Sequence, residues 1–360
     1  MAGAAAAVSP PVEKADATAW IAVAAGALGA MLATLDISIV NSALPTIQGE
    51  IGATGTEGTW IATAFLVAEI IIIPLSAWLE RLLGLRTLLI VAVSAFTAFS
   101  VLCGIATDLT TMIIGRTGQG FMGGALIPTA MTIVAKRLPP SQQPIGMALF
   151  GMTVVLGPVM GPLVGGWLTE NLSWHYAFFV NVPVCALLLA LLFIGLPHEK
   201  PDWVYLREAD WAGIVGMILG LGGLTVVLEE GHREEWFEST LIVQLTLMTI
   251  VGFALLTYGQ LYARKPVLKL RLMLSRQFAS VVVMALALGM VMYGSTYVIP
   301  QFLAIISDYN ALQTGFVIFW MGVPAFLLMP VLPFMIRRIH IRIAVGAGMF
   351  IMALSCFVSI

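Results

Sequence analysis

Charged residues are scarce in this 360-residue sequence. They make up 10% of it, whereas roughly a quarter is usual in a soluble globular protein. Hydrophobic residues account for 60%. This composition excludes a soluble enzyme or a nucleic-acid-binding protein, and the net charge of −2 gives no sign of a polyanionic partner. We therefore expect an integral membrane protein in contact with a lipid bilayer.

Cysteine and histidine are also scarce. The three cysteines, Cys103, Cys185 and Cys356, all lie inside apolar runs, which excludes a disulfide scaffold. The four histidines lie in different loops, so no metal site is expected. There is no Walker-type phosphate loop either. We expect no cofactor.

Long apolar runs dominate what remains, and many approach the roughly 20 residues that a helix needs to cross a bilayer. We therefore predict an all-α membrane protein with about eleven transmembrane helices. They are placed at 20–45, 58–79, 87–106, 109–135, 145–168, 175–196, 211–228, 241–262, 279–305, 313–336 and 343–360. Residues 1–19 are expected to be a disordered tail, because prolines and charges interrupt their alanine run.

The Lys and Arg residues are unequally distributed between the two sides of the membrane when the loops between these helices are assigned to alternating sides. All but two of the 17 Lys and Arg residues fall on the side of the N-terminal tail. The exceptions are Arg233, on the opposite side, and Arg116, inside a span. Because cytoplasmic loops carry the excess of Lys and Arg, the N-terminus is predicted to be cytoplasmic.

Two short basic connections, 78–86 and 333–342, resemble each other. One helix before each connection's own span, the first span (20–45) and the ninth (279–305) carry Pro45 and Pro300 near their outer ends. This suggests that the ninth to eleventh helices repeat the first three, as in transporters built from parallel halves. The seventh and eighth helices are then an insertion.

Three ionisable residues lie at membrane depth: Asp36, Glu69 and Arg116. Such residues are costly in lipid unless paired or hydrated, so they are functional candidates. Their estimated depths place all three in one layer, which favours pairing of opposite charges. The residues leave two interpretations open, a proton-coupling site and a static ion pair that holds the bundle together. Glu69 could instead attract a cationic substrate or have a structural role.

Small residues form two helix faces. Arg116, Gln119, Gly120, Gly123 and Gly124 share one face, whose glycines allow close approach of another helix. The segment 157–166 repeats glycine and proline every four residues, which predicts a tightly packed, bent helix. Its motif residues are Gly157, Pro158, Gly161, Pro162, Gly165 and Gly166.

Several motifs together resemble the major facilitator superfamily, and within it the fourteen-helix drug:proton antiporters that include the permeases of Emr-type multidrug pumps. Residues 35–47 resemble the first-helix motif of that family, and 116–120 resemble its proton-coupling motif R-x-x-Q-G. The segment 157–166 is similar to its antiporter motif, and 174–183 to its W-x-W-x-F-x-I-N-V-P motif. The segment 228–237 resembles the loop between its inserted helices.

The cytoplasmic loop between the second and third helices departs from the family pattern. In residues 77–86 the acid and the arginine are displaced by one position when the motif is anchored on Gly84. The resemblance implies a gating role for Glu80 and Arg81, together with Gly84 and Arg86.

The resemblance implies an N-terminal six-helix bundle at 20–196, a linker with two inserted helices at 197–265, and the first half of a C-terminal bundle at 266–360. With eleven of fourteen helices present, we expect the sequence to be truncated at its C-terminal end. The substrate cavity is expected between the halves, lined by the first, fourth and ninth helices. Its candidate residues are Asn41, Gln119, Tyr293, Tyr297 and Phe302.

The implied function is proton-driven export of amphipathic toxic compounds across the inner membrane, with the proton motive force as the energy source. The resemblance also implies a periplasmic membrane-fusion adaptor and an outer-membrane channel as partners. Two alternatives stay open. One is a specific exporter or a symporter on the same scaffold, since fold does not fix substrate. The other is a truncated remnant that transports nothing.

Overall fold

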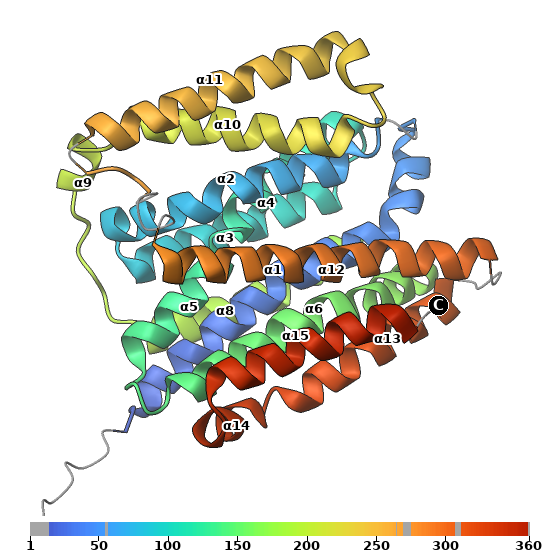
Figure 1. The fold of residues 1–360 in the computed structure, drawn as a ribbon. Helices are drawn as coiled ribbons and strands as arrows, with labels where there is room; N and C mark the ends of the chain where they lie inside the picture. Colours follow the sequence, from blue (N-terminus) through green and yellow to red (C-terminus); the bar gives the residue numbers. More distant parts are fainter. Residues whose placement is uncertain (1–13, 55–56, 264, 269–274, 307–310, 359–360) are drawn as a thin grey trace, which may run out of the picture.

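Long helices run side by side in the computed structural model of the chain (Figure 1). It describes residues 14–54, 57–263, 265–268, 275–306 and 311–358, apart from some side chains beyond residue 292. Within these ranges every regular element is a helix, which confirms the all-α prediction. The first eight are α1 (Ala17–Ile51), α2 (Trp60–Leu83), α3 (Leu85–Gly104), α4 (Leu109–Gly123), α5 (Leu126–Arg137), α6 (Gln143–Asn171), α7 (Tyr176–Phe179) and α8 (Asn181–Gly195). The others are α9 (Val204–Arg207), α10 (Trp211–Glu230), the 3₁₀ helix η1 (Trp236–Glu238), α11 (Thr240–Tyr262), α12 (Arg276–Ile306), α13 (Ala311–Leu328), α14 (Leu332–Arg338) and α15 (Ile341–Val358).

Seven helical segments in the described part of the chain are long and apolar enough to cross a membrane. They are α1, α2, α3, α6, the continuous run of α7 and α8, α10 and α11. The chain is therefore a multi-pass membrane protein. The other four expected spans also contain helices, namely α4 with α5, α12, α13 and α15.

Three expected spans are each divided into two helices, a difference that proline explains. Pro128 follows the break between α4 and α5, and it has no N–H group to bond the carbonyl of Gly124. Pro183 likewise leaves the carbonyl of Phe179 free near the start of α8. Pro330 lies in the turn between α13 and α14. The apolar runs were correctly located, but the prediction that each of these three forms one continuous helix was wrong.

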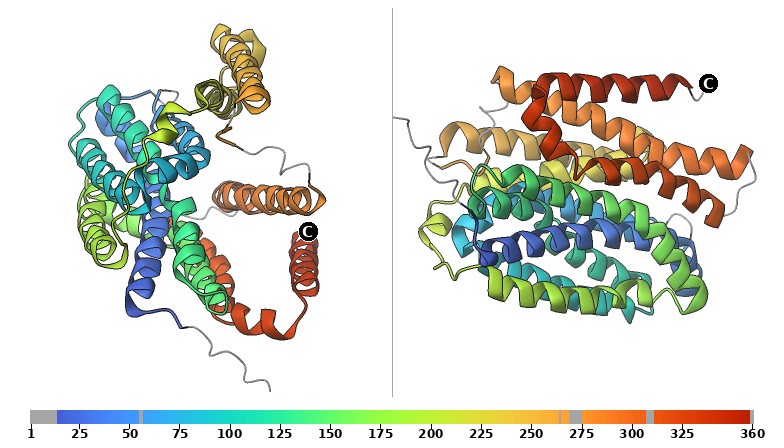
Figure 2. Two further views of the ribbon diagram at one scale, coloured as in Figure 1. Left: turned by 90° about the vertical axis from the view of Figure 1, so that its left-hand side faces the viewer. Right: turned by 90° about the horizontal axis from the view of Figure 1, so that it is seen from below.

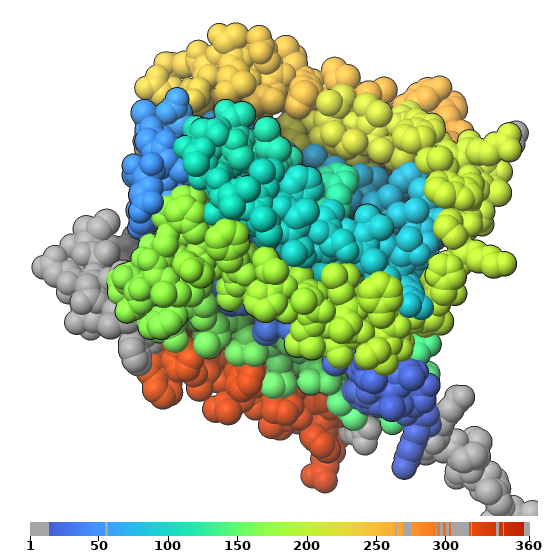
Figure 3. All heavy atoms as spheres, turned by 180° about the vertical axis from the view of Figure 1, so that it is seen from behind, coloured from blue at the N-terminus to red at the C-terminus, as the bar shows by residue number. Residues whose placement is uncertain are grey.

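The N-terminal helices form the packed part of the molecule, and α1 lies at its centre between α6, α5 and α8. The two turned views place the pair α10 and α11 on one flank and α12 to α15 on another (Figure 2). The space-filling view from behind shows the same order, with the inserted pair along one edge and the C-terminal helices along the opposite one (Figure 3). Helix α13 reaches the bundle through α6, where Gly322 packs against Val159.

The pair α10 and α11 is fixed to the bundle through a buried carboxylate. Glu230, at the end of α10, accepts a 2.7 Å hydrogen bond from Thr63 Oγ1 of α2 and a 2.9 Å bond from Arg233. Its side chain is only 3% exposed. Within the pair, Gly220 and Gly252 meet backbone to backbone, so there is no room for a Cβ atom. Helices α10 and α11 thus pack on α2 as one unit.

The glycines of the 157–166 motif form the interface between α6 and α1. A Cβ atom added at Gly157, Gly161 or Gly165 would collide with Thr34, Ser38 or Ser42 of α1, in that order. These contacts repeat every four residues on both helices, which is the geometry of a small-residue crossing. The predicted tight packing of this motif is therefore present. Gly166 differs, because nothing lies within 4 Å of its missing Cβ.

We expect Gly161→Ala to weaken the α1 to α6 contact. The added methyl group meets the backbone of Ser38 as well as its side chain, so the helices must separate, which costs about 1–3 kcal/mol. Denaturant titration in mixed micelles measures the loss. Gly166→Ala is the matched control and should be as stable as the parent protein or slightly more so. Equal stability of the two variants would contradict this packing.

Candidate functional site

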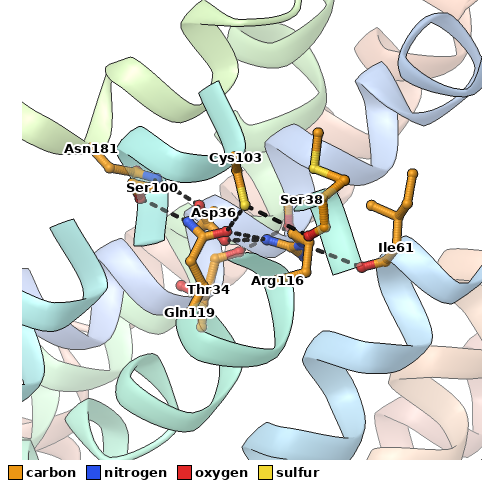
Figure 4. A network of polar contacts seen from close by, with 10 residues as sticks. Thr34, Asp36, Ser38, Ile61, Ser100, Cys103, Arg116, Gln119 and Asn181 are labelled. Atoms are coloured by element: carbon orange, nitrogen blue, oxygen red, sulfur yellow. Dashed lines mark hydrogen bonds and ion pairs between the residues drawn. The ribbon is translucent and has the colours of Figure 1, made fainter. Parts of the chain in front are cut away.

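A buried carboxylate at the middle of α1 is the centre of a polar hub. Asp36 Oδ2 accepts a hydrogen bond of 2.7 Å from Arg116 of α4, which also makes an ion pair. Asp36 Oδ1 accepts 2.6 Å and 3.2 Å bonds from Asn181 Nδ2 of α8 and Gln119 Nε2 of α4. Figure 4 shows these side chains converging on Asp36 from α4 and α8. The carboxylate therefore has three donors.

Arg116 is satisfied on several sides. Its Nε donates to the carbonyl of Ile61 on α2 over 3.2 Å, and its guanidinium carbon lies 4.2 Å from the centre of the Phe65 ring. A further Nη1 bond of 3.2 Å reaches Gln119 Oε1. Arginine suits this position because its planar group donates in several directions while it stacks on an aromatic ring.

Helix α3 supplies the remaining members of the hub. Ser100 Oγ accepts from Gln119 Nε2 at 2.7 Å and from Asn181 Nδ2 at 3.1 Å. The Cys103 thiol donates to Gln119 Oε1 over 3.4 Å. We call Asp36, Ser100, Cys103, Arg116, Gln119 and Asn181 the Asp36 hub. Its members are all at most 1% exposed, so this conformation seals them from water.

Local sequence explains how α4 brings Arg116 into place. Asp108 caps the helix, since its carboxylate accepts from the N–H of Thr111 at 2.9 Å. One turn after Arg116, Gly120 lies against the backbone of Phe65, where a Cβ atom would overlap a carbonyl oxygen. The glycine face predicted from sequence thus allows α4 to approach α2 closely, and this proximity lets Arg116 reach Ile61.

Glu69 lies beside the hub and is not hydrogen-bonded within it. It is on α2 one turn beyond Phe65, partly buried, and packs against Gly124. The expected pairing of opposite charges therefore joins Arg116 to Asp36, and Glu69 joins none of the hub's hydrogen bonds.

That the expected residues line one substrate cavity stays a prediction. Gln119 belongs to the buried hub, so in this conformation it does not line an open cavity. Asn41 is exposed on α1, and Phe302 is 56% exposed on α12. The side chains of Tyr293 and Tyr297 lie outside the described residues.

The segment 77–86 was expected as a loop, but it consists of the end of α2, Gly84 and the start of α3. It has partners that the sequence did not indicate. Glu80 forms a 2.6 Å ion pair with Lys136 of α5, whereas Arg81 is exposed. Gly84 has a φ of +79°, which favours glycine. The next N–H group, that of Leu85, donates to Glu199 over 2.6 Å, so a residue beyond α8 caps α3.

Arg86, in the first turn of α3, lies over the Phe193 ring of α8, with 5.3 Å between its guanidinium carbon and the ring centre. This contact ties the start of α3 to α8. The gating role of Glu80, Arg81, Gly84 and Arg86 stays a prediction.

Sequence reasoning missed the hub residues Ser100, Cys103 and Asn181. Asn181 carried a signal, because it lies in the motif at 174–183, but that motif had no assigned chemistry. Ser100 and Cys103 are small residues in an apolar run and carried none. Their place depends on how α3 packs against α4 and α8.

Comparison with protein families gives a match to the Major Facilitator Superfamily over residues 26–360. The chain belongs to this superfamily. Since these are transport proteins, the chain is part of a transporter family and not an enzyme family, as the motifs had implied.

Among curated relatives, the chain is 34% identical over 334 residues to the colistin resistance protein EmrB of Acinetobacter baumannii, covering 93% of this chain and 65% of that protein. It is 31% identical to the multidrug export protein EmrB of Escherichia coli K12, covering 92% of this chain and 64% of that protein. It is 32% identical to the fatty acid resistance protein FarB of Neisseria gonorrhoeae, covering 97% and 68%. The chain thus spans about two thirds of the length of these relatives.

Solved structures agree on the fold. The proton:xylose symporter XylE superposes with a TM-score of 0.59 at 14% identity, covering 89% of this chain and 69% of that one. A peptide transporter, POT, gives 0.58 at 16% identity with the same coverage. At such identities the likeness concerns the fold alone.

We expect Arg116→Lys to destabilise the protein although the charge is kept. A lysine ammonium cannot bond Asp36 and Ile61 while it also stacks on Phe65, and lost bonds to buried charged groups cost about 2 kcal/mol. Unfolding in mixed micelles tests this. The control is Arg233→Lys, because Arg233 is 39% exposed in its pair with Glu230 and should change stability by less than about 1 kcal/mol. Comparable losses in both variants would contradict a special role for the guanidinium.

Proposed function

We propose that the protein exports amphipathic toxic compounds across the inner membrane in exchange for protons, with Asp36 as the proton carrier. The observation that carries the proposal is the sealed Asp36 hub in a chain of a transporter superfamily. A carboxylate with three hydrogen-bond donors and no access to water can change its protonation only when the helices around it move. Such a site can load a proton from one side and release it to the other.

The ion pair gives a physical route from protonation to movement. When Asp36 takes up a proton, its charge is lost and so is most of its attraction to Arg116. Helices α1 and α4, which the pair joins, can then separate at lower cost. The membrane potential supplies about 2.3 kcal/mol for each charge moved across 100 mV. Glu69, beside the hub, is the second candidate for proton transfer or for attraction of a cationic compound.

The proposed substrate class is supported by the relatives, whose names refer to colistin, to multiple drugs and to fatty acids. Fatty acids have a polar end and an apolar chain, which supports an amphipathic substrate. A cavity between the two halves, reached by Asn41 and Phe302 with Tyr293 and Tyr297, would receive it. The relative named for fatty acid resistance also supports a second candidate, an exporter specific for one such class.

The orientation that we propose has the N-terminus in the cytoplasm. Arg86 at the start of α3 and Lys136 and Arg137 at the end of α5 line one surface hollow. Arg233 lies near Thr59 beyond the other end of α2. This gathering of basic residues at one end is what the positive-inside rule expects. A periplasmic adaptor and an outer-membrane channel are the proposed partners on the opposite side.

The proposed domains are those of the sequence analysis. Residues 20–196 form the first bundle, 197–265 the linker with the inserted pair, and 266–360 belong to the second bundle. The packing of α10 on α2 supports motion of the inserted pair with the first bundle. No cofactor takes part in this proposal.

We expect Asp36→Asn to abolish proton movement driven by substrate, because an amide cannot carry the proton. The full-length protein is reconstituted in vesicles that contain a pH-sensitive dye. The substrates are an amphipathic cation and a fatty acid, each added as a gradient. The rate of proton movement should fall at least tenfold, to that of empty vesicles.

Asp108→Asn is the matched control for this variant. Asp108 is an exposed helix cap, and asparagine caps a helix equally well, so proton movement should be kept. Insertion and yield of both variants are compared by gel filtration. Full proton movement in a well-folded Asp36→Asn protein would refute the assigned role of Asp36.

A further inference from the structure

The side-chain amide of Asn181 on α8 is only partly hydrogen-bonded. Its Nδ2 donates to Asp36 and to Ser100, but its Oδ1 is buried and has no hydrogen-bond partner in the described part of the chain. A buried amide oxygen without a partner is costly. Its presence beside the proposed proton carrier therefore calls for an explanation.

The other hub side chains cannot receive a hydrogen bond from a protonated Asp36. Arg116 has only donors. Gln119 Oε1 already accepts from Arg116 and Cys103, and its Nε2 donates to Asp36 and Ser100. Ser100 Oγ accepts two bonds from the neighbouring amides. The free acceptor in the hub is Asn181 Oδ1.

A half-turn of the Asn181 amide exchanges its two ends without moving the helix. Nδ2 now lies 2.6 Å from Asp36 Oδ1, as an ionised carboxylate requires. After the half-turn Oδ1 takes that position and can accept the O–H of a protonated Asp36 and the hydroxyl of Ser100. Each orientation therefore leaves one amide atom unpaired, so the number of unpaired atoms does not favour either orientation.

We infer that Asn181 is a positioning residue that completes the proton site by bonding Asp36 in both protonation states, through Nδ2 when Asp36 is ionised and through Oδ1 when it is protonated. This inference rests on the proposed proton-carrying role of Asp36. Asn181 is the first residue of α8, directly after the break at Val180. Its orientation therefore links the protonation state of Asp36 on α1 to the start of α8.

Removal of Asn181 should destabilise the ionised and the protonated forms of Asp36 to different extents. A hydrogen bond to a carboxylate is roughly twice as strong as one between neutral groups, so Asn181 favours the ionised form overall. The other charged or titratable groups around Asp36 are Arg116 on α4, Glu69 on α2, Cys103 on α3 and Cys185 on α8. These groups are unchanged in an Asn181 variant, so a shift in the protonation midpoint of Asp36 is caused by the loss of Asn181 itself.

The test compares Asn181→Leu, which keeps the side-chain shape, with Asn171→Leu as control. Asn171 is exposed at the end of α6 and bonds only the carbonyl of Trp167. Two quantities are followed against pH in the full-length protein. The first is the infrared band of the protonated carboxyl group that Asp36→Asn removes. The second is the rate of substrate-driven proton movement.

We expect both midpoints in Asn181→Leu to move to higher pH by about one unit, the size of one hydrogen bond to a charged group. Asn171→Leu should leave them unchanged. Asn181→Asp is the second variant, in case leucine disturbs folding. It places a second carboxyl group 2.6 Å from Asp36, so the pair would share one proton and the midpoint should rise further.

The outcomes separate this inference from the proposed function. A shifted infrared midpoint without substrate-driven proton movement in any variant, the parent protein included, supports the role of Asn181 and refutes the exchange activity. Exchange that persists in both Asn181 variants with unchanged midpoints overturns the inference. A lower yield or rate with unchanged midpoints also overturns it, since that is the result of a merely structural contact.

Discussion

The ion pair of Asp36 and Arg116 is the constraint on which the N-terminal helices depend. Both side chains are at most 1% exposed, and the removal of two charges from water costs several kcal/mol for each ion unless other groups replace the lost hydration. Three donors around the carboxylate, a backbone carbonyl and an aromatic ring around the guanidinium serve this purpose. These groups come from α2, α4 and α8. Because all of them must contact the one ion pair, they fix the relative positions of these helices and α1.

Close packing of α1 connects the ion pair to the contact between α1 and α6. One face of α1 carries Asp36 into the hub, and another carries Thr34, Ser38 and Ser42 against the glycines of α6. A helix held this tightly on both sides has few ways to relax, because packed interiors do not deform continuously. In the proposed mechanism, a change of charge at Asp36 would therefore act on the α1 to α6 contact as well. Helix α6 in turn carries α13, which gives the proposed proton site a physical connection to the C-terminal helices.

Much of the fold could be predicted from the sequence, because a bilayer imposes length and apolarity on every span. The all-α class, the positions of the apolar runs and the glycine contacts of α6 followed from such patterns. So did the pairing of opposite charges in one layer, but not the choice of Asp36 over Glu69 as the partner of Arg116. The breaks between α4 and α5 and between α7 and α8 did not, although Pro128 and Pro183 mark them. A proline in an apolar run either stays inside a helix, as Pro158 and Pro162 do in α6, or lies next to a break, and neighbouring helices decide which.

The sequence by itself determined which residues could not face lipid, since Asp36, Glu69 and Arg116 are charged within apolar spans whatever the packing. Only the tertiary structure decided how they are partnered. Asn181 lies 145 positions from Asp36 along the chain, and Lys136 lies 56 positions from Glu80, so neither contact has a local signal. Gln119 was expected at a cavity but lies in the hub, because Ser100 and Asn181 approach it from α3 and α8. Hydrogen-bond partners are set by which helices meet, and the spacing of residues along one helix cannot supply that information.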